Sequence, residues 1–172
     1  LSLKVPKVCV LLTVCNGSKW LEAQVDSIVN QKDVNLKVFI SVDSSTDNSQ
    51  EICDDLADRY GFISILPYGD RFGGAAQNFF RLIRDVNFDA FDYISFSDQD
   101  DIWLDSKLIN AIEIIEAKNV DGYSGNVLAF WPDGREMQVI KNQRQRRFDY
   151  IFESAGPGCT FVFKKELASK FQ

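Results

Sequence analysis

The chain has 172 residues, 45% of them hydrophobic, and its net charge is −6 at neutral pH. This size and apolar content fit one domain with a sizeable core, and the acidic balance argues against nonspecific binding to nucleic acid. No apolar run approaches the roughly 20 residues that a membrane-spanning helix needs, and the N-terminus lacks the sections of a signal peptide. The four cysteines form no C-x-x-C pair, so we expect buried free thiols in a cytoplasmic protein.

Strand and helix patterns alternate along residues 1–120. The run Lys7–Val14 is apolar with almost no alternation, which is typical of a strand covered on both faces. Further strands are expected at 36–42, 62–66 and 93–97, and helices at 21–31, 47–60, 76–83 and 108–119. Asp47 and Gln50 fit a capping box at the start of the second helix. This order predicts an α/β fold whose Rossmann-like, mostly parallel sheet is flanked by helices.

The pattern changes beyond Gly122. Two apolar runs at 127–131 and 137–140 flank Pro-Asp-Gly, which indicates a hairpin, so we expect a mixed arrangement in the last third. The chain stops at Gln172 within what resembles the start of a helix, and we interpret it as C-terminally truncated.

Polar groups follow three of the expected strands, at 13–17, 43–47 and 98–101. Ligands of such sheets gather at the carboxyl ends of the strands, so we expect these groups to share one edge. Asp98, Asp100 and Asp101 are crowded carboxylates beside a buried strand, and a cation would offset their repulsion. Oxygen ligands in a chain without histidine favour Mg²⁺ or Mn²⁺ over zinc.

The acidic group is open to other interpretations. It could be a solvated turn in which Asp101 or Asp105 caps the next helix. A phosphohydrolase of the haloacid dehalogenase type also uses Asp-x-Asp, but on an early strand, whereas Asp98 follows the fourth. A calcium loop would need an Asp-x-Asp-x-Asp-Gly pattern that the sequence lacks.

Several segments, taken in order, resemble the family 2 glycosyltransferases, which have the GT-A fold, and within them the bacterial rhamnosyltransferase-like group. The segments are LLTVCNG at 11–17, LEAQVDSIVNQ at 21–31, DSSTD at 43–47, GAAQNF at 74–79 and SDQDDIWL at 97–104. The resemblance covers nearly the whole chain. It implies a donor-binding part at residues 1–120 and the start of an acceptor-side part at 121–172, within one catalytic domain.

The resemblance also implies roles for individual residues. Asp43 would accept the imide N–H of uracil or thymine, and Asp98 and Asp100 would hold Mn²⁺ or Mg²⁺ against the diphosphate. The nucleotide-binding residues would be Thr13, Asn16, Asp43, Gly74, Asn78 and Asp98. The catalytic base is expected beyond Gln172, because neither Asp149 nor Glu153 sits in a recognisable base motif.

The function implied is inverting transfer of a sugar from a UDP- or dTDP-linked donor to a saccharide or lipid-linked acceptor, in cell-surface polysaccharide synthesis. A noncatalytic nucleotide-sugar-binding module of the same fold remains the alternative. We expect no nucleic-acid partner. The basic stretch at 141–147 leaves peripheral association with the inner face of the cell membrane open.

Overall fold

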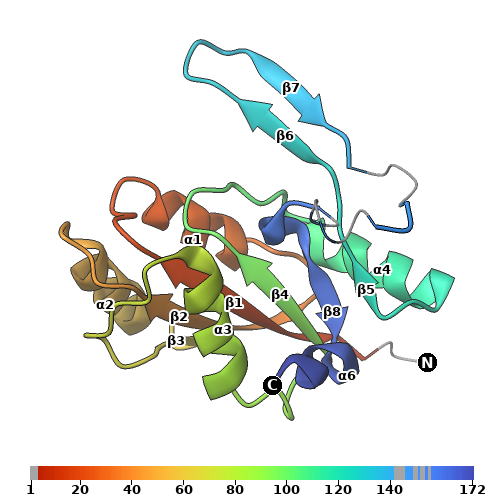
Figure 1. The fold of residues 1–172 in the computed structure, drawn as a ribbon, viewed down its shortest axis with the longest axis horizontal. Coiled ribbons are helices and arrows are strands. Elements are labelled where there is room, and N and C mark those ends of the chain that lie inside the picture. Colours follow the sequence, from red (N-terminus) through yellow and green to blue (C-terminus); the bar gives the residue numbers. More distant parts are fainter. Residues whose placement is uncertain (1–3, 142–145, 149–150, 152–153, 155) are drawn as a thin grey trace.

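The computed structural model describes residues 4–141, 146–148, 151, 154 and 156–172. In these residues one sheet has the strand order β3-β2-β1-β4-β8-β5 (Figure 1). Its strands are β1 (Lys7–Val14), β2 (Asn35–Val42), β3 (Ile63–Ile65), β4 (Tyr93–Ser97), β5 (Gly122–Tyr123) and β8 (Val162–Lys164). The first four pair in parallel, and β8 runs antiparallel to both β4 and β5. The prediction of a mostly parallel sheet that becomes mixed near its end is therefore confirmed.

Helices cover both faces of the sheet because successive side chains of β1 point to opposite sides. Val8, Val10 and Leu12 pack with α1 (Leu21–Val29), α2 (Ser49–Arg59) and α4 (Lys107–Lys118). Cys9 and Leu11 pack on the other side with α3 (Ala75–Asp85) and α6 (Lys165–Ala168). Each fully buried leucine of this strand contributes about 2 kcal/mol by leaving water. The unbroken apolar sequence of β1 thus reflects two separate cores.

The helix ends depend on short polar contacts. Asn119 follows α4 in the left-handed conformation, with φ of 48°, which ends the helix close to the predicted position. The capping box expected at α2 is wrong. Asp47 accepts hydrogen bonds from the backbone N–H groups of Ser49 and Ser18, and the Gln50 amide donates instead to Asp54. Because α2 begins at Ser49, two residues after Asp47, Asp47 is not the N-cap residue of this helix. Its side chain instead joins two loops.

The last third contains the predicted hairpin, formed by β6 (Val127–Phe130) and β7 (Glu136–Val139). In Figure 1 it stands apart from the rest of the ribbon, above the end of the sheet at which β1 and β4 finish. Two short 3-10 helices, η1 (Gly158–Thr160) and η2 (Ser169–Phe171), lie on either side of β8 and α6 along the chain. In the described part of the chain, no helix has the length and apolarity needed to cross a bilayer.

The four cysteines are free thiols, as expected, but they differ in burial. Cys9, Cys53 and Cys159 are buried, whereas Cys15 is exposed. The expectation of a buried thiol is therefore wrong for Cys15. The reason is that β1 ends at Val14, so the next residue already belongs to the loop at the open edge of the sheet.

Candidate functional site

The carboxyl ends of β2, β1 and β4 lie side by side because these strands are neighbours in the sheet. A pocket of about 590 Å³ opens at this edge. It is lined by every residue that the sequence predicted for the site: Thr13, Asn16, Asp43, Gly74, Asn78, Asp98 and Asp100. Residues from four separate segments of the chain, 13–16, 43–46, 71–78 and 98–100, are thereby brought together around one cavity.

Asp43 lies at the end of β2 and is only 4% exposed. Its Oδ1 accepts hydrogen bonds from the backbone N–H groups of Phe72, at 2.8 Å, and Ser44, at 2.7 Å. Its Oδ2 accepts one from the N–H of Gly73 at 3.0 Å. A carboxylate offers about four lone-pair sites, so Oδ2 can still accept a hydrogen bond from a ligand. The same side chain therefore holds the 69–74 loop and faces the pocket.

Asn16 connects the loops that follow β1 and β2. Its Oδ1 accepts hydrogen bonds from the Thr46 N–H, at 2.8 Å, and the Thr46 hydroxyl, at 3.1 Å. Asn16 has φ of 50°, a left-handed conformation that asparagine tolerates better than most residues. Thr13 pairs with Ser41 in the sheet and is nearly buried. The strand end is therefore rigid, and Asn16 fixes the pocket wall through its side chain.

Asn78 and Gly74 come from the start of α3. The Asn78 Nδ2 donates to the Ser41 carbonyl at 3.0 Å, and the residue is 2% exposed. Its Oδ1 is buried without a hydrogen-bond partner among the described residues. Such an orphaned acceptor next to a pocket is unusual and leaves capacity for a ligand or water. Gly74 precedes α3, and an added Cβ would meet only the flexible end of Gln77, so the backbone geometry does not by itself require glycine there.

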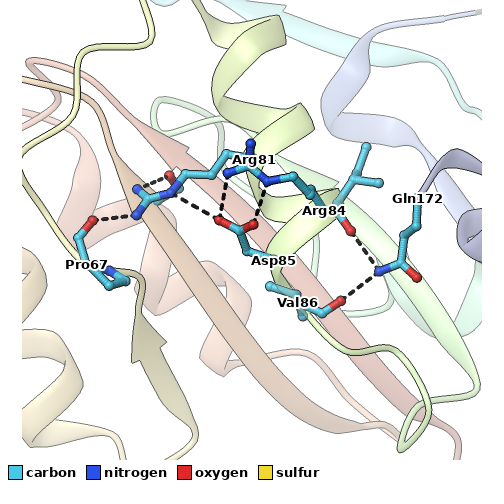
Figure 2. A network of polar contacts seen from close by, with 8 residues as sticks. Pro67, Arg81, Arg84, Asp85, Val86 and Gln172 are labelled. Atoms are coloured by element: carbon cyan, nitrogen blue, oxygen red, sulfur yellow. Dashed lines mark hydrogen bonds and ion pairs between the residues drawn. The ribbon is translucent and has the colours of Figure 1, made fainter.

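Figure 2 shows what holds α3 against the sheet. The buried Arg81 donates to the Ser41 hydroxyl at 3.1 Å and to the Pro67 carbonyl, and it forms an ion pair with Asp85. Its guanidinium also lies 4.9 Å from the centroid of the Phe72 ring. Arg81 therefore fastens α3, the end of β2 and the 67–72 loop together beneath the pocket.

Burial, together with the nearby charges of Asp101 and Asp100, raises the pKa of Asp98 to about 6. Burial also raises the pKa of Asp101, although a hydrogen bond from the Cys159 thiol opposes that shift. Ligand atoms of Asp98, Asp101 and Cys159 lie within 4.8 Å of one another. This group differs from the predicted pair, because Asp100 lines the pocket but is not a member of it.

The donor set indicates which atoms suit a cation. Burial raises the pKa of the Cys159 thiol to about 12, with Asp101 adding to the effect, and a sulfur ligand suits soft metals rather than Mg²⁺ or Mn²⁺. One oxygen of Asp101 is buried without a hydrogen-bond partner among the described residues. The carboxylates of Asp98, Asp100 and Asp101 therefore fit a hard divalent cation better than zinc.

Lys107 lies behind this acidic group and was not found by sequence reasoning. Its Nζ is 3.3 Å from the centroid of the Trp103 ring and 3.3 Å from the Ser95 hydroxyl. Burial lowers the pKa of Lys107 to about 7, although Cys159 and Asp101 favour its charged form. In the sequence it looked like an ordinary lysine at the start of a helix, and no spacing set it apart.

Sequence reasoning placed Ser44, Thr46 and Gln99 in the polar groups at this edge but gave them no role, and it missed Arg71 as a pocket residue. Arg71 brings a positive charge to a pocket whose other charged lining residues are aspartates. The sequence signal that could have identified Arg71 is a basic residue in a glycine-rich loop that follows a strand. Asp149 and Glu153, the carboxylates considered for the base, lie outside the described residues.

Comparisons with known proteins agree with this geometry. A family model described as Glycosyl transferase family 2 matches residues 9–171. The chain is 51% identical over 158 residues to dTDP-rhamnosyl transferase RfbG of Shigella flexneri, covering 91% of this chain and 55% of that protein.

Two solved structures share the fold. TarS 1-349 of S. aureus in complex with UDP-GlcNAc has a TM-score of 0.72 at 16% identity, covering 95% of this chain and 47% of that one. Mannosyltransferase PcManGT of Pyrobaculum calidifontis, in complex with GDP-Man and Mn²⁺, has a TM-score of 0.69 at 19% identity, covering 96% and 46%. The chain thus spans about half the length of the proteins it matches.

Proposed function

Because the chain belongs to family 2 of the glycosyltransferases and has the GT-A fold, we propose that the intact protein transfers a sugar from a nucleoside diphosphate to a saccharide or lipid-linked acceptor. The process would be the synthesis of a cell-surface polysaccharide. One observation carries the proposal: Asp43, which follows β2, lines the same pocket as Asp98 and Asp100, which follow β4 on the other side of β1. That pocket pairs a buried hydrogen-bond acceptor with a separate acidic group, as a nucleoside diphosphate would require.

The proposed donor is a dTDP-linked sugar, with a UDP-linked sugar as the second candidate. Thymine and uracil both present an imide N–H, which the free lone pair of Asp43 Oδ2 would accept. A buried polar group of this kind discriminates strongly against a base that lacks the donor. Thr13 and Asn16 would line the base and ribose side. The 51% identity to a dTDP-rhamnosyl transferase supports a rhamnosyl group as the one transferred.

The proposed cofactor is Mn²⁺ or Mg²⁺, held by Asp98 and Asp100. The fit rests on the crowded carboxylates, since burial and the neighbouring aspartates raise the pKa of Asp98 and a bound cation would favour its ionised form. A bound cation would supply Lewis-acid stabilisation of the departing diphosphate. Asp98 and Asp100 would hold this cation, and Arg71, which also lines the pocket, would add positive charge near the phosphates.

The proposed reaction is direct displacement at the anomeric carbon with inversion, in which a base removes the proton of the acceptor hydroxyl. We place that base beyond Gln172 and assign the donor to residues 1–120 and the acceptor to the part that begins at 121. The position of Gly158, where an added Cβ would lie 3.7 Å from Asp98, supports an acceptor loop next to the donor site. Residues 1–172 should therefore bind the donor but transfer poorly, and robust transfer by this chain alone would contradict that assignment.

Calorimetric titration tests the donor site. dTDP, UDP and GDP are titrated into the chain with Mn²⁺, with Mg²⁺ and with a chelator. We expect metal-dependent binding of dTDP, weaker binding of UDP, and loss of binding in Asp100→Ala. Asp55→Ala removes an equally exposed carboxylate from α2, outside the pocket, and should bind like the parent chain.

A folded sample that binds none of the three nucleotides would overturn the donor-site assignment. Binding that is equal with metal and with chelator would instead remove the cation from the proposal. The noncatalytic module is tested in the intact protein, where donor binding without any sugar transfer to polysaccharide or lipid-linked acceptors would favour it.

A further inference from the structure

Exposed apolar side chains are concentrated in the β6–β7 hairpin and the residues next to it. Among the described residues, nearly half of the exposed large hydrophobic side chains fall between positions 128 and 151. They are Leu128, Phe130, Trp131, Met137, Ile140, Phe148 and Ile151. Exposed apolar side chains concentrated in one segment of an otherwise well-packed domain indicate an interaction surface.

The hairpin has a distinct outer face. Leu128 pairs with Gln138 and Phe130 with Glu136, so these four side chains point to the same side. Leu128 is 55% exposed and Phe130 61%. The opposite side carries Val127, Ala129 and Val139, which are half-buried. We call the Leu128, Phe130 and Ile140 side the outer face, since Ile140 continues the alternation beyond β7.

Such a hairpin needs a partner. The pair β6–β7 forms a separate two-stranded sheet in the described chain, and an isolated two-stranded hairpin is at best marginally stable in water. The apolar side chains of the outer face, which lie beside Gln138 and Glu136, add to that cost because they stay hydrated. The partner should therefore cover Leu128, Phe130 and Ile140.

Charge indicates the kind of partner. The segment 127–148 contains five basic residues and two acidic ones, within a chain whose net charge is −6. The guanidinium of Arg147 lies 5.3 Å from the centroid of Phe148, and that of Arg135, which is paired with Asp133 at 2.6 Å, lies 5.2 Å from the centroid of the Trp131 ring. Aromatic rings beside basic groups are typical of the boundary between lipid and water. A second copy of this chain would cover the apolar face. An anionic lipid surface matches both the apolar face and the basic charges.

We propose that the outer face of the hairpin docks on the surface of an anionic lipid bilayer. Leu128, Phe130 and Ile140 enter the headgroup and upper acyl region, and Lys141 with Arg147 contacts the lipid phosphates. The hairpin stays at the interface, because the unpaired edges of β6 and β7 must remain hydrated. This inference extends the proposed function, since the hairpin stands at the end of the sheet where the pocket opens (Figure 1) and a lipid-linked acceptor would arrive there.

Sedimentation with vesicles tests the proposal, without nucleotide or metal. We expect the chain to bind vesicles of phosphatidylglycerol and phosphatidylethanolamine at least about tenfold more tightly than vesicles of phosphatidylcholine, and less tightly as salt rises. Leu128→Ser with Phe130→Ser should weaken binding by about tenfold or more. Met137→Ser, which removes a 55% exposed side chain from the other side of the hairpin, should change it less than about twofold.

Lys141→Glu with Arg147→Glu should abolish the preference for anionic vesicles. Circular dichroism melting checks that each variant is folded, which we expect because all five substituted side chains are exposed. Absence of vesicle binding by the parent chain, or equal binding to both kinds of vesicle, would overturn the proposal. A different result would also overturn it: light scattering shows that the parent chain is a dimer and that the Leu128→Ser, Phe130→Ser variant is a monomer, and neither protein binds vesicles. Nucleotide titration of the same variants keeps this outcome separate from the donor site, because a failed docking surface leaves nucleotide affinity unchanged.

Discussion

The side-chain amide of Gln99 forms both of its hydrogen bonds with the backbone of Cys15. The Cys15 N–H donates to Oε1 at 2.7 Å, and Nε2 donates to the Cys15 carbonyl at 3.0 Å. This pair joins the loop after β1 to the acidic loop after β4. Gly17 permits it, since a Cβ at that position would lie 2.3 Å from Gln99 Oε1. The relative position of these two pocket walls thus depends on the Gln99 amide and on the absence of a side chain at Gly17.

Gly17→Ala is expected to separate these walls. The added methyl group has no room unless the Gln99 amide leaves Cys15, so two hydrogen bonds are lost at a cost of about 1–3 kcal/mol in the free energy of unfolding. Nucleotide affinity should fall by about tenfold, because residues 13–16 and 98–100 line the same pocket. Urea denaturation and calorimetric titration measure the two effects.

Gly61→Ala is the matched control. An added Cβ at Gly61 meets nothing within 4 Å, so neither stability nor nucleotide affinity should fall. An unchanged Gly17→Ala variant would mean that the Gln99–Cys15 pair does not hold the pocket together.

Asp43→Asn should lower nucleotide affinity and loosen the 69–74 loop together. The amide NH₂ would face one of the backbone N–H donors that the carboxylate now accepts, at a cost of about 1–3 kcal/mol. We expect at least a tenfold loss of dTDP affinity by titration, and faster hydrogen exchange of Phe72 and Gly73. Asp58→Asn, on the exposed side of α2, should change neither. Loss of affinity with unchanged exchange at Phe72 would show that the two roles of Asp43 are separable.

Stability should fall as pH rises through the titration of Asp98. Its pKa is about 6 in the folded chain, against about 3.9 when unfolded, so the folded state binds more protons between these values. The free energy of unfolding therefore decreases as pH rises from about 4 to about 6. Allowing for partial exposure, Asp98→Asn should be more stable than the parent by about 1–2 kcal/mol at pH 7.5 and equal to it near pH 4. Urea denaturation in the presence of chelator measures this, and parallel pH profiles of the two proteins would refute it.

Arg81 and Arg84 contact the same carboxylate, Asp85, from very different environments (Figure 2). Arg81→Met should cost about 2–4 kcal/mol in the free energy of unfolding, because it leaves the Pro67 carbonyl and the Ser41 hydroxyl without their buried donor. Arg84→Met removes an exposed ion pair and should cost less than about 0.5 kcal/mol. Urea denaturation of both variants decides this, and equal losses would mean that the buried contacts of Arg81 add nothing.

Much of the fold could be read from the sequence because its signals are local. The unbroken apolar run of β1 is typical of a strand covered on both faces, and alternation with amphipathic helices implies parallel neighbours. The capping box failed because short polar side chains have several partners within reach, and in the folded chain Asp47 bonds to Ser18 from a different loop. The choice among such partners is made by tertiary contacts.

The sequence by itself determined the order of strands and helices, the acidic group after β4 and the set of residues that could line a site, because these depend on periodicity and on neighbours along the chain. Only the tertiary structure decided which distant side chains meet. It brought Gln99 to Cys15, the Cys159 thiol to Asp101, and Lys107 behind the carboxylates. Hydrogen bonds and pKa shifts act over a few ångströms in space, and a distance of 58 or 84 residues along the chain carries no information about them.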